Sequence, residues 1–211
     1  SHVPEPDKGE GLRFEWRIFR HRHLALAVLA QLFYVGAQAG IWGITINYVI
    51  ETLPGVSKEA ASKNFMAVGT LLFVVGRFLG TFLLGYIKDN RLLGVYGLLA
   101  SLLCVGAVVL TGKPAVYSIL AVNFFMSIMF PTIFALGVKG LDHETKLGSS
   151  LIIMAIVGGA ILPPIMGLIA DTVGIQASFL LPVLCFLVVA FYGFQGYKPR
   201  EHADALAAQN A

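Results

Sequence analysis

The sequence contains few charged residues. Only 13% of its 211 residues are Asp, Glu, Lys or Arg, whereas about a quarter of the residues are charged in typical soluble domains. Hydrophobic residues make up 57%, a share that excludes both a soluble single domain and a disordered chain. The two cysteines, Cys104 and Cys185, lie within apolar runs, so they indicate neither a disulfide framework nor a redox compartment.

Acidic and His side chains are missing from the interiors of the apolar runs. All 12 acidic residues and all five His fall in tails, in connectors or at the ends of runs. Intramembrane proton relays, metal sites and catalysis depend on such groups. We therefore expect no enzyme activity, no metal and no cofactor. The polar groups within the runs are uncharged hydrogen-bonding side chains and Arg77, a set suited to binding a neutral, polyhydroxylated solute.

Long apolar runs are the main positive feature of the sequence. Each is long enough to cross a hydrocarbon core about 30 Å thick at a helical rise of about 1.5 Å per residue. A transmembrane barrel is excluded, because its strands alternate in segments of about ten residues. The predicted fold class is an all-α membrane protein with six transmembrane helices, at residues 24–50, 64–87, 92–111, 115–138, 148–170 and 177–197.

Lys and Arg gather on one side of the predicted membrane. The two tails and the connectors 88–91 and 139–147 carry 11 of the 15 basic residues, and the opposite side carries only three. The positive-inside rule therefore places both termini in the cytoplasm. The Arg-rich segment 13–22 is interleaved with aromatic residues, which favours a juxtamembrane role in contact with the lipid bilayer over nucleic-acid binding.

The first predicted helix has two distinct faces. At 100° per residue, the small residues fall on one arc and the amide and aromatic residues fall on another. The small face predicts close packing against a neighbouring helix, and the polar face predicts the wall of a water-filled cavity. The alternative for Gln31 and Gln38 is a hydrogen bond to another helix; the cavity is the favoured interpretation for Gln38, and the two are equally good for Gln31. The small face holds Gly36, Gly40, Gly43 and Asn47, and the polar face holds Gln31, Tyr34, Gln38, Trp42 and Thr45.

Arg77 interrupts the second predicted helix, in which Gly69, Gly76 and Gly80 share another face. An Arg at mid-bilayer costs about 2.5–3.5 kcal/mol, which backbone carbonyls, a polar partner or snorkelling must offset. The sequence leaves open whether Arg77 locks helices together or acts in substrate binding or gating. The connector that follows carries Asp89, which is positioned to interact with a helix N-terminus.

Prolines interrupt the fourth and fifth predicted helices. Pro131 has no N–H, so the carbonyl of Ser127 loses its helical donor, and we expect a kink beside a polar and aromatic face. That face consists of Asn123, Ser127, Phe130 and Phe134. In the fifth helix, the prolines predict bending, either as a passive packing feature or as a moving gate. The residues involved are Gly158, Gly159, Pro163, Pro164 and Gly167.

Several motifs resemble a known family. They are Gly85-x-x-x-Asp89, Tyr34-Val-Gly-Ala-Gln38 with Trp42, Gly76-Arg77-Phe78-x-Gly80-Thr81, the segment 126–134 around Pro131, and Thr145-Lys146-x-Gly148-Ser-Ser150 leading to Gly158-Gly159 and Pro163. Together they resemble the C-terminal half of the L-fucose:proton symporter family of the major facilitator superfamily. In that fold, two six-helix halves enclose a substrate site near mid-bilayer.

The resemblance implies a sugar–proton symporter of the bacterial inner membrane that works by alternating access. Residues 1–22 would then be the end of a cytoplasmic linker, 23–198 helices seven to twelve, and 199–211 a cytoplasmic tail. A preceding N-terminal six-helix domain would supply the proton-coupling residue. The implied substrate-binding residues are Gln38, Trp42, Tyr34, Asn123, Phe130 and Phe134, and the implied structural or gating residues are Arg77, Gly76, Gly80, Asp89, Pro131, Gly158, Gly159, Pro163 and Pro164.

Two alternatives remain at this stage. The first concerns the sugar, because Met129 and Phe130 resemble the glucose/galactose branch of the family, whereas Gln38 with Trp42 resembles the fucose branch. The substrate is therefore a hexose or a deoxyhexose. The second alternative is a complete small membrane protein with six spans that oligomerises as a channel or scaffold.

Overall fold

The computed structural model describes residues 21–141 and 144–198. The predicted tail and all but the last two residues of the predicted linker lie outside these ranges. Within them, six helical segments are long and apolar enough to cross a membrane, which confirms the predicted spans. These segments are Arg22–Thr52, Lys58–Leu84, Asp89–Val109, Gly112–Val138, Thr145–Val173 and Ile175–Gly196.

Four of the six spans change helix geometry along their length, and only α1 (Arg22–Thr52) and α4 (Asp89–Val109) are α-helical throughout. The second span consists of α2 (Lys58–Ala60), a π-helix η2 (Ala61–Phe65) and α3 (Met66–Leu84). The fourth divides into α5 (Gly112–Met126) and α6 (Met129–Val138). The fifth consists of α7 (Thr145–Met154), a 3₁₀ turn η4 (Ala155–Val157) and α8 (Gly158–Val173), and the sixth of α9 (Ile175–Ser178), α10 (Leu180–Phe191) and a π-helix η5 (Tyr192–Gly196).

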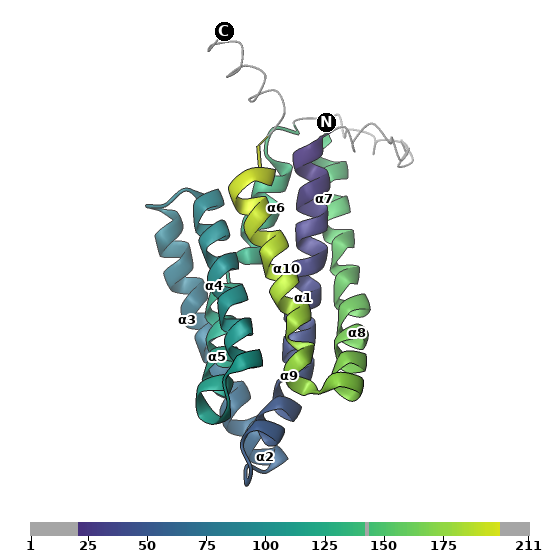
Figure 1. Ribbon diagram of the computed structural model, residues 1–211. Helices are drawn as coiled ribbons and strands as arrows, with labels where there is room; N and C mark the ends of the chain where they lie inside the picture. Colours follow the sequence, from purple (N-terminus) through teal and green to yellow (C-terminus); the bar gives the residue numbers. More distant parts are fainter. Residues whose placement is uncertain (1–20, 142–143, 199–211) are drawn as a thin grey trace, which may run out of the picture.

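Helix α1 lies at the centre of the bundle (Figure 1). It packs against α8 on one side and against α10, α5 and α6 on the other, while α4 packs on α10 and α5. Helix α3 packs on α5 at the flank opposite α8. The second and fifth spans are the least buried of the six, so these two flanks are left for lipid or for further protein.

Close backbone contacts hold the outer helices to the bundle. A Cβ atom on Gly158 would collide with the carbonyl oxygen of Leu32 in α1, and one on Gly36 would collide with the side chain of Leu162 in α8. A Cβ atom on Gly76 of α3 would likewise collide with the carbonyl oxygen of Phe124 in α5. The predicted packing role of these small faces is therefore confirmed, with the exceptions of Gly43, which has no neighbouring atom within 4 Å, and Asn47, which is exposed.

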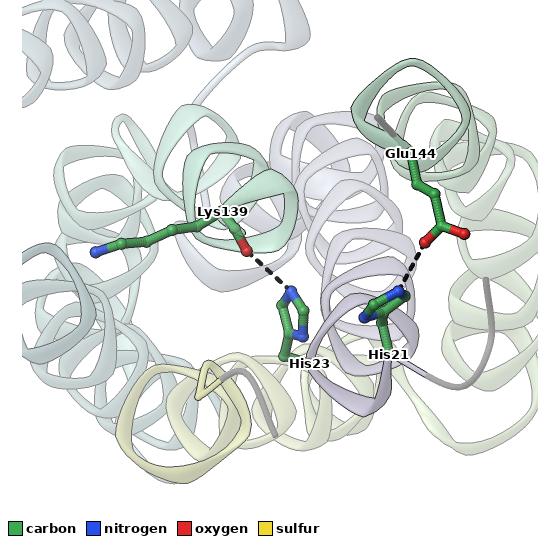
Figure 2. A network of polar contacts seen from close by, with 4 residues as sticks. All are labelled: His21, His23, Lys139 and Glu144. Atoms are coloured by element: carbon green, nitrogen blue, oxygen red, sulfur yellow. Dashed lines mark hydrogen bonds and ion pairs between the residues drawn. The ribbon is translucent and has the colours of Figure 1, made fainter. Parts of the chain in front are cut away.

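The start of α1 contacts the connector between α6 and α7 (Figure 2). His21 Nε2 lies 2.7 Å from a carboxylate oxygen of Glu144, and His23 Nε2 lies 3.1 Å from the carbonyl oxygen of Lys139, to which it donates. Glu144 is the residue that precedes the first turn of α7. These contacts place the beginning of the first span and the 139–147 connector at the same end of the bundle, as the basic residues predict.

Candidate functional site

A cavity of about 120 Å³ lies between α1, α3 and α5. Its wall is mostly apolar, and the π-helix η2 contributes Phe65 at the point where it meets α3. The lining residues are Trp42, Thr45, Phe65, Met66, Gly69, Thr70, Phe73, Leu120 and Asn123. Two residues of the predicted substrate-binding set, Trp42 and Asn123, therefore meet in this wall although they are far apart in the sequence.

A hydrogen bond fixes Trp42 against Asn123. The indole Nε1 donates to Asn123 Oδ1 at 2.8 Å, and Asn123 Nδ2 donates to the carbonyls of Ile119 and Leu120 at 3.3 and 3.2 Å. The side chain of Asn123 is only 4% exposed, whereas that of Trp42 is 43% exposed. The edge-to-face contact between Trp42 and Phe73 has a centroid distance of 5.6 Å, so two aromatic rings form one side of the cavity.

Arg77 occupies the break that Pro131 makes in the fourth span. Its Nε and Nη2 donate to the carbonyl of Ser127 at 3.0 and 2.7 Å, and its guanidinium lies 5.1 Å from the centroid of the Phe73 ring. The helix is interrupted at Ser127 and Ile128, which confirms the predicted kink. Arg77 thus binds the carbonyl that the proline deprives of a helical donor.

Tyr34 is buried and is not part of the cavity wall. It has no exposed surface, and its hydroxyl donates to the carbonyl of Met126 at 2.9 Å. Its ring meets Phe130 edge to face at a centroid distance of 6.5 Å. Tyr34 is not among the residues that line this cavity, and its predicted contact with substrate stays a prediction. The hydroxyl therefore has a hydrogen-bond partner at the end of α5, as a buried hydroxyl requires.

Three other predicted residues lie outside the cavity wall. Gln38 is half-buried one turn before Trp42, and Phe130 and Phe134 are half-buried on α6. Gln31 is fully buried, and neither atom of its amide has a hydrogen-bond partner within the described part of the chain. It therefore forms neither the predicted bond between helices nor part of the cavity.

The predicted gating residues are divided between two interfaces. Gly76 and Gly80 allow α3 to pack closely on α5 and on the residues that follow it. Gly158 and Gly159 allow α8 to pack closely on α1. Pro163 and Pro164 lie inside α8, but the span departs from α-helical geometry earlier, at η4. Asp89 is the first residue of α4, where a carboxylate interacts favourably with the helix dipole.

Sequence reasoning missed Thr70 and Phe73, which line the cavity beside Trp42. Both share a helical stripe with Arg77, at spacings of three and four residues, and this spacing was the available signal. Phe73 reads as one of many apolar residues in a lipid-facing helix. Its role becomes visible only when α3 is placed against α1.

Comparisons with known proteins agree with these features, although no protein-family model matches the chain. The chain is 40% identical over 177 residues to the L-fucose-proton symporter of Escherichia coli K12, covering 83% of this chain and 40% of that protein. It is 38% identical over 195 residues to the glucose/galactose transporter of Brucella abortus biovar 1, covering 91% of this chain and 45% of that protein. The chain thus spans less than half the length of these curated relatives.

Solved structures give the same result. A crystal structure of a variant of the E. coli fucose:proton symporter superposes with a TM-score of 0.82 at 40% identity, covering 84% of this chain and 43% of that one. A major facilitator transporter, FucP, in the outward conformation gives a TM-score of 0.80 at 38% identity, covering 86% and 43%. The chain is a multi-pass membrane protein related to the fucose and glucose/galactose transporters, and it corresponds to one six-helix half of the major facilitator fold.

Proposed function

We propose that this chain is the C-terminal half of a sugar–proton symporter of the bacterial inner membrane. The observation that carries the proposal is the aromatic cavity wall of Trp42 and Phe73, backed by Asn123, within a half-fold that is 40% identical to an L-fucose-proton symporter. The transported solute is a hexose or deoxyhexose, the classes named for the relatives. The activity is transport and not catalysis.

The sugar rests with an apolar face on the exposed ring of Trp42, and Gln38, one helical turn earlier on α1, hydrogen-bonds its hydroxyl groups. Sugar rings present C–H groups on their faces, which aromatic rings accommodate well. Phe130 and Phe134, which are half-buried on α6, contribute further apolar surface to the site.

Alternating access combines rocking of one half against the other with local gating, and the interruptions of the fourth and fifth spans supply points at which a helix can bend. The break beside Pro131 and the 3₁₀ turn before Pro163 and Pro164 are the sites where backbone hydrogen bonds are already missing or rearranged. The N-terminal six-helix half covers the exposed flanks, closes the other side of the cavity and supplies the proton-binding carboxylate. Within the described helices of this chain, the acidic residues lie near helix ends, as Glu51, Asp89 and Asp171 do.

Residues 1–22 form the end of the cytoplasmic linker, 23–198 the transmembrane domain, and 199–211 a cytoplasmic tail. Both ends of the described chain then face the cytoplasm. The contacts that His21 and His23 make in Figure 2 lie on the same side of the membrane.

The test is sugar binding and uptake by the whole transporter that contains this chain. Radiolabelled L-fucose, D-glucose and D-galactose identify the substrate, and Trp42→Ala and Gln38→Ala then probe the site. We expect both variants to bind the substrate at least tenfold more weakly at normal membrane levels. The matched control is Phe191→Ala, because Phe191 is 45% exposed, as Trp42 is at 43%, but lies on α10 outside the cavity wall. Unchanged affinity in Trp42→Ala contradicts the proposed site.

A further inference from the structure

Two polar residues of the cavity wall have different tasks. Resting on the sugar site proposed above, we propose that Thr70 hydrogen-bonds the sugar directly, whereas Asn123 is a positioning residue that holds the Trp42 ring and makes no contact with the sugar. Neither task is apparent from the sequence. Asn123 is the more conspicuous polar residue, and Thr70 is a small residue within the long apolar run of α3.

Both polar atoms of Asn123 already have hydrogen-bond partners inside the protein. Its amide nitrogen has two N–H groups, and the two acceptors within reach are the carbonyls of Ile119 and Leu120, one turn earlier in its own helix. Its oxygen accepts the indole N–H of Trp42 at 2.8 Å, and the side chain is 4% exposed. The oxygen keeps a second lone pair, but the side chain is so deeply buried that a sugar hydroxyl has little access to it, whereas the face of Trp42 is open.

The same bond determines what Trp42 offers to a ligand. An indole has a single donor, and here that donor points into the protein. Phe73 meets the ring edge to face and fixes it from another direction. Trp42 therefore presents a held aromatic face to the cavity, which favours stacking and not hydrogen bonding.

Thr70 is the lining residue with an available hydroxyl. Thr45, the other threonine of the wall, is 3% exposed and donates to the Ile41 carbonyl at 2.6 Å. Thr132 and Thr172 also donate to carbonyls four residues earlier. Thr70 is exposed, and its hydroxyl makes no such bond within the described ranges. It lies one turn before Phe73 on the same face of α3, so its hydroxyl stands at the edge of the aromatic surface.

The experiment measures sugar affinity of the whole transporter for its best substrate among L-fucose, D-glucose and D-galactose, and for analogues that each lack one hydroxyl. Thr70→Val keeps the shape and removes the hydroxyl. We expect it to weaken binding of the parent sugar about 3- to 10-fold, the range of one neutral hydrogen bond, and to leave the affinity for one particular deoxy analogue unchanged. Thr172→Val is the matched control and leaves every affinity unchanged.

Asn123→Ala gives a different pattern. It weakens binding of the parent sugar and of every analogue by the same factor, and combining it with Trp42→Phe, which removes the indole N–H, adds little further loss. If Asn123→Ala does not reach the membrane, Trp42→Phe alone carries the test, because it breaks the same bond and keeps an aromatic ring. A uniform loss across the analogues is then expected.

Three outcomes overturn the inference. They are a loss in Asn123→Ala that vanishes for a single deoxy analogue, a full additive loss on combination with Trp42→Phe, and a Thr70→Val variant with unchanged affinities. Failure of the proposed function gives a separate signature, because the parent transporter then binds none of the three sugars.

Discussion

Replacing Arg77 with Met removes both N–H donors that bind the Ser127 carbonyl, at 3.0 and 2.7 Å. The α-helix offers this carbonyl no substitute, since residue 131 is a proline and has no N–H. Ser127 has no exposed surface. The variant Arg77→Met therefore leaves a buried carbonyl oxygen without a donor, at the point where α5 ends and α6 begins.

Two opposing terms set the size of the effect. A buried carbonyl that loses its partner costs about 1–3 kcal/mol, and hydrogen bonds between membrane helices average about 0.6 and reach about 1.7 kcal/mol. Removing Arg also relieves part of the roughly 2.5–3.5 kcal/mol that a buried Arg costs, a part reduced by the exposure of Arg77. The net change can therefore be small. The coupling between Arg77 and Pro131 is the sharper quantity.

Pro131→Ala restores an N–H that can donate to the Ser127 carbonyl within the helix. In that background Arg77→Met no longer orphans the carbonyl, so its cost should fall by about 1 kcal/mol. Reversible unfolding of the whole transporter, measured for the parent, both single variants and the double variant, gives this coupling. Lys63→Met is the control for loss of a positive charge, because Lys63 is exposed in η2 on the same span. A coupling below about 0.5 kcal/mol, the usual error of additivity, would refute the assignment.

Three further predictions concern packing, a buried amide and topology. Gly158→Ala should destabilise the protein by about 1–3 kcal/mol because its Cβ meets a carbonyl of α1, whereas Gly167→Ala, with no atom within 4 Å, should stay within about 1 kcal/mol of the parent; equal effects in thermal unfolding contradict the packing. Gln31→Met should leave stability unchanged or raise it by about 1–2 kcal/mol, because the amide has no partner within the described residues, and a clear loss in the same assay would reveal one. On a Cys-free background, an impermeant reagent applied to intact cells should label a cysteine at Lys58 but not one at Lys146, and the opposite pattern would invert the topology.

The long-range features of this fold were predictable because the membrane imposes them. A bilayer requires about 20 apolar residues per helix and penalises charge within it, so the spans can be counted from the sequence. The interruption at Ser127 follows in the same way, because a proline four residues later removes a known hydrogen bond. The sequence also showed that Arg77 needs a hydrogen-bond acceptor within the membrane. It did not show that this acceptor is the unpaired carbonyl of Ser127.

The composition of the cavity was less predictable. Tyr34 and Trp42 share the polar face of α1, yet Tyr34 is fully buried and Trp42 is 43% exposed. A helical wheel gives only the direction of each side chain around the helix axis. The difference in exposure between Tyr34 and Trp42 arises from their positions along that axis, where the neighbouring helices differ. Near Tyr34 the neighbouring helix is broken, and its carbonyl at Met126 takes the hydroxyl, whereas two turns later α3 and α5 leave space in front of the indole.

A single sequence does not show how far each helix is rotated about its own axis relative to its neighbours. For α3, close contacts at glycines determine this rotation. Gly76 lets α3 approach the carbonyl of Phe124 so closely that no other residue fits, and a Cβ on Gly69 would lie 3.3 Å from Asn123 Nδ2. With those two points fixed, α3 has one orientation against α5. Residues at angles between the glycines and the lipid, Thr70 and Phe73 among them, are thereby directed toward Trp42. The packing face therefore determines the binding face, although no packing residue needs to touch a sugar.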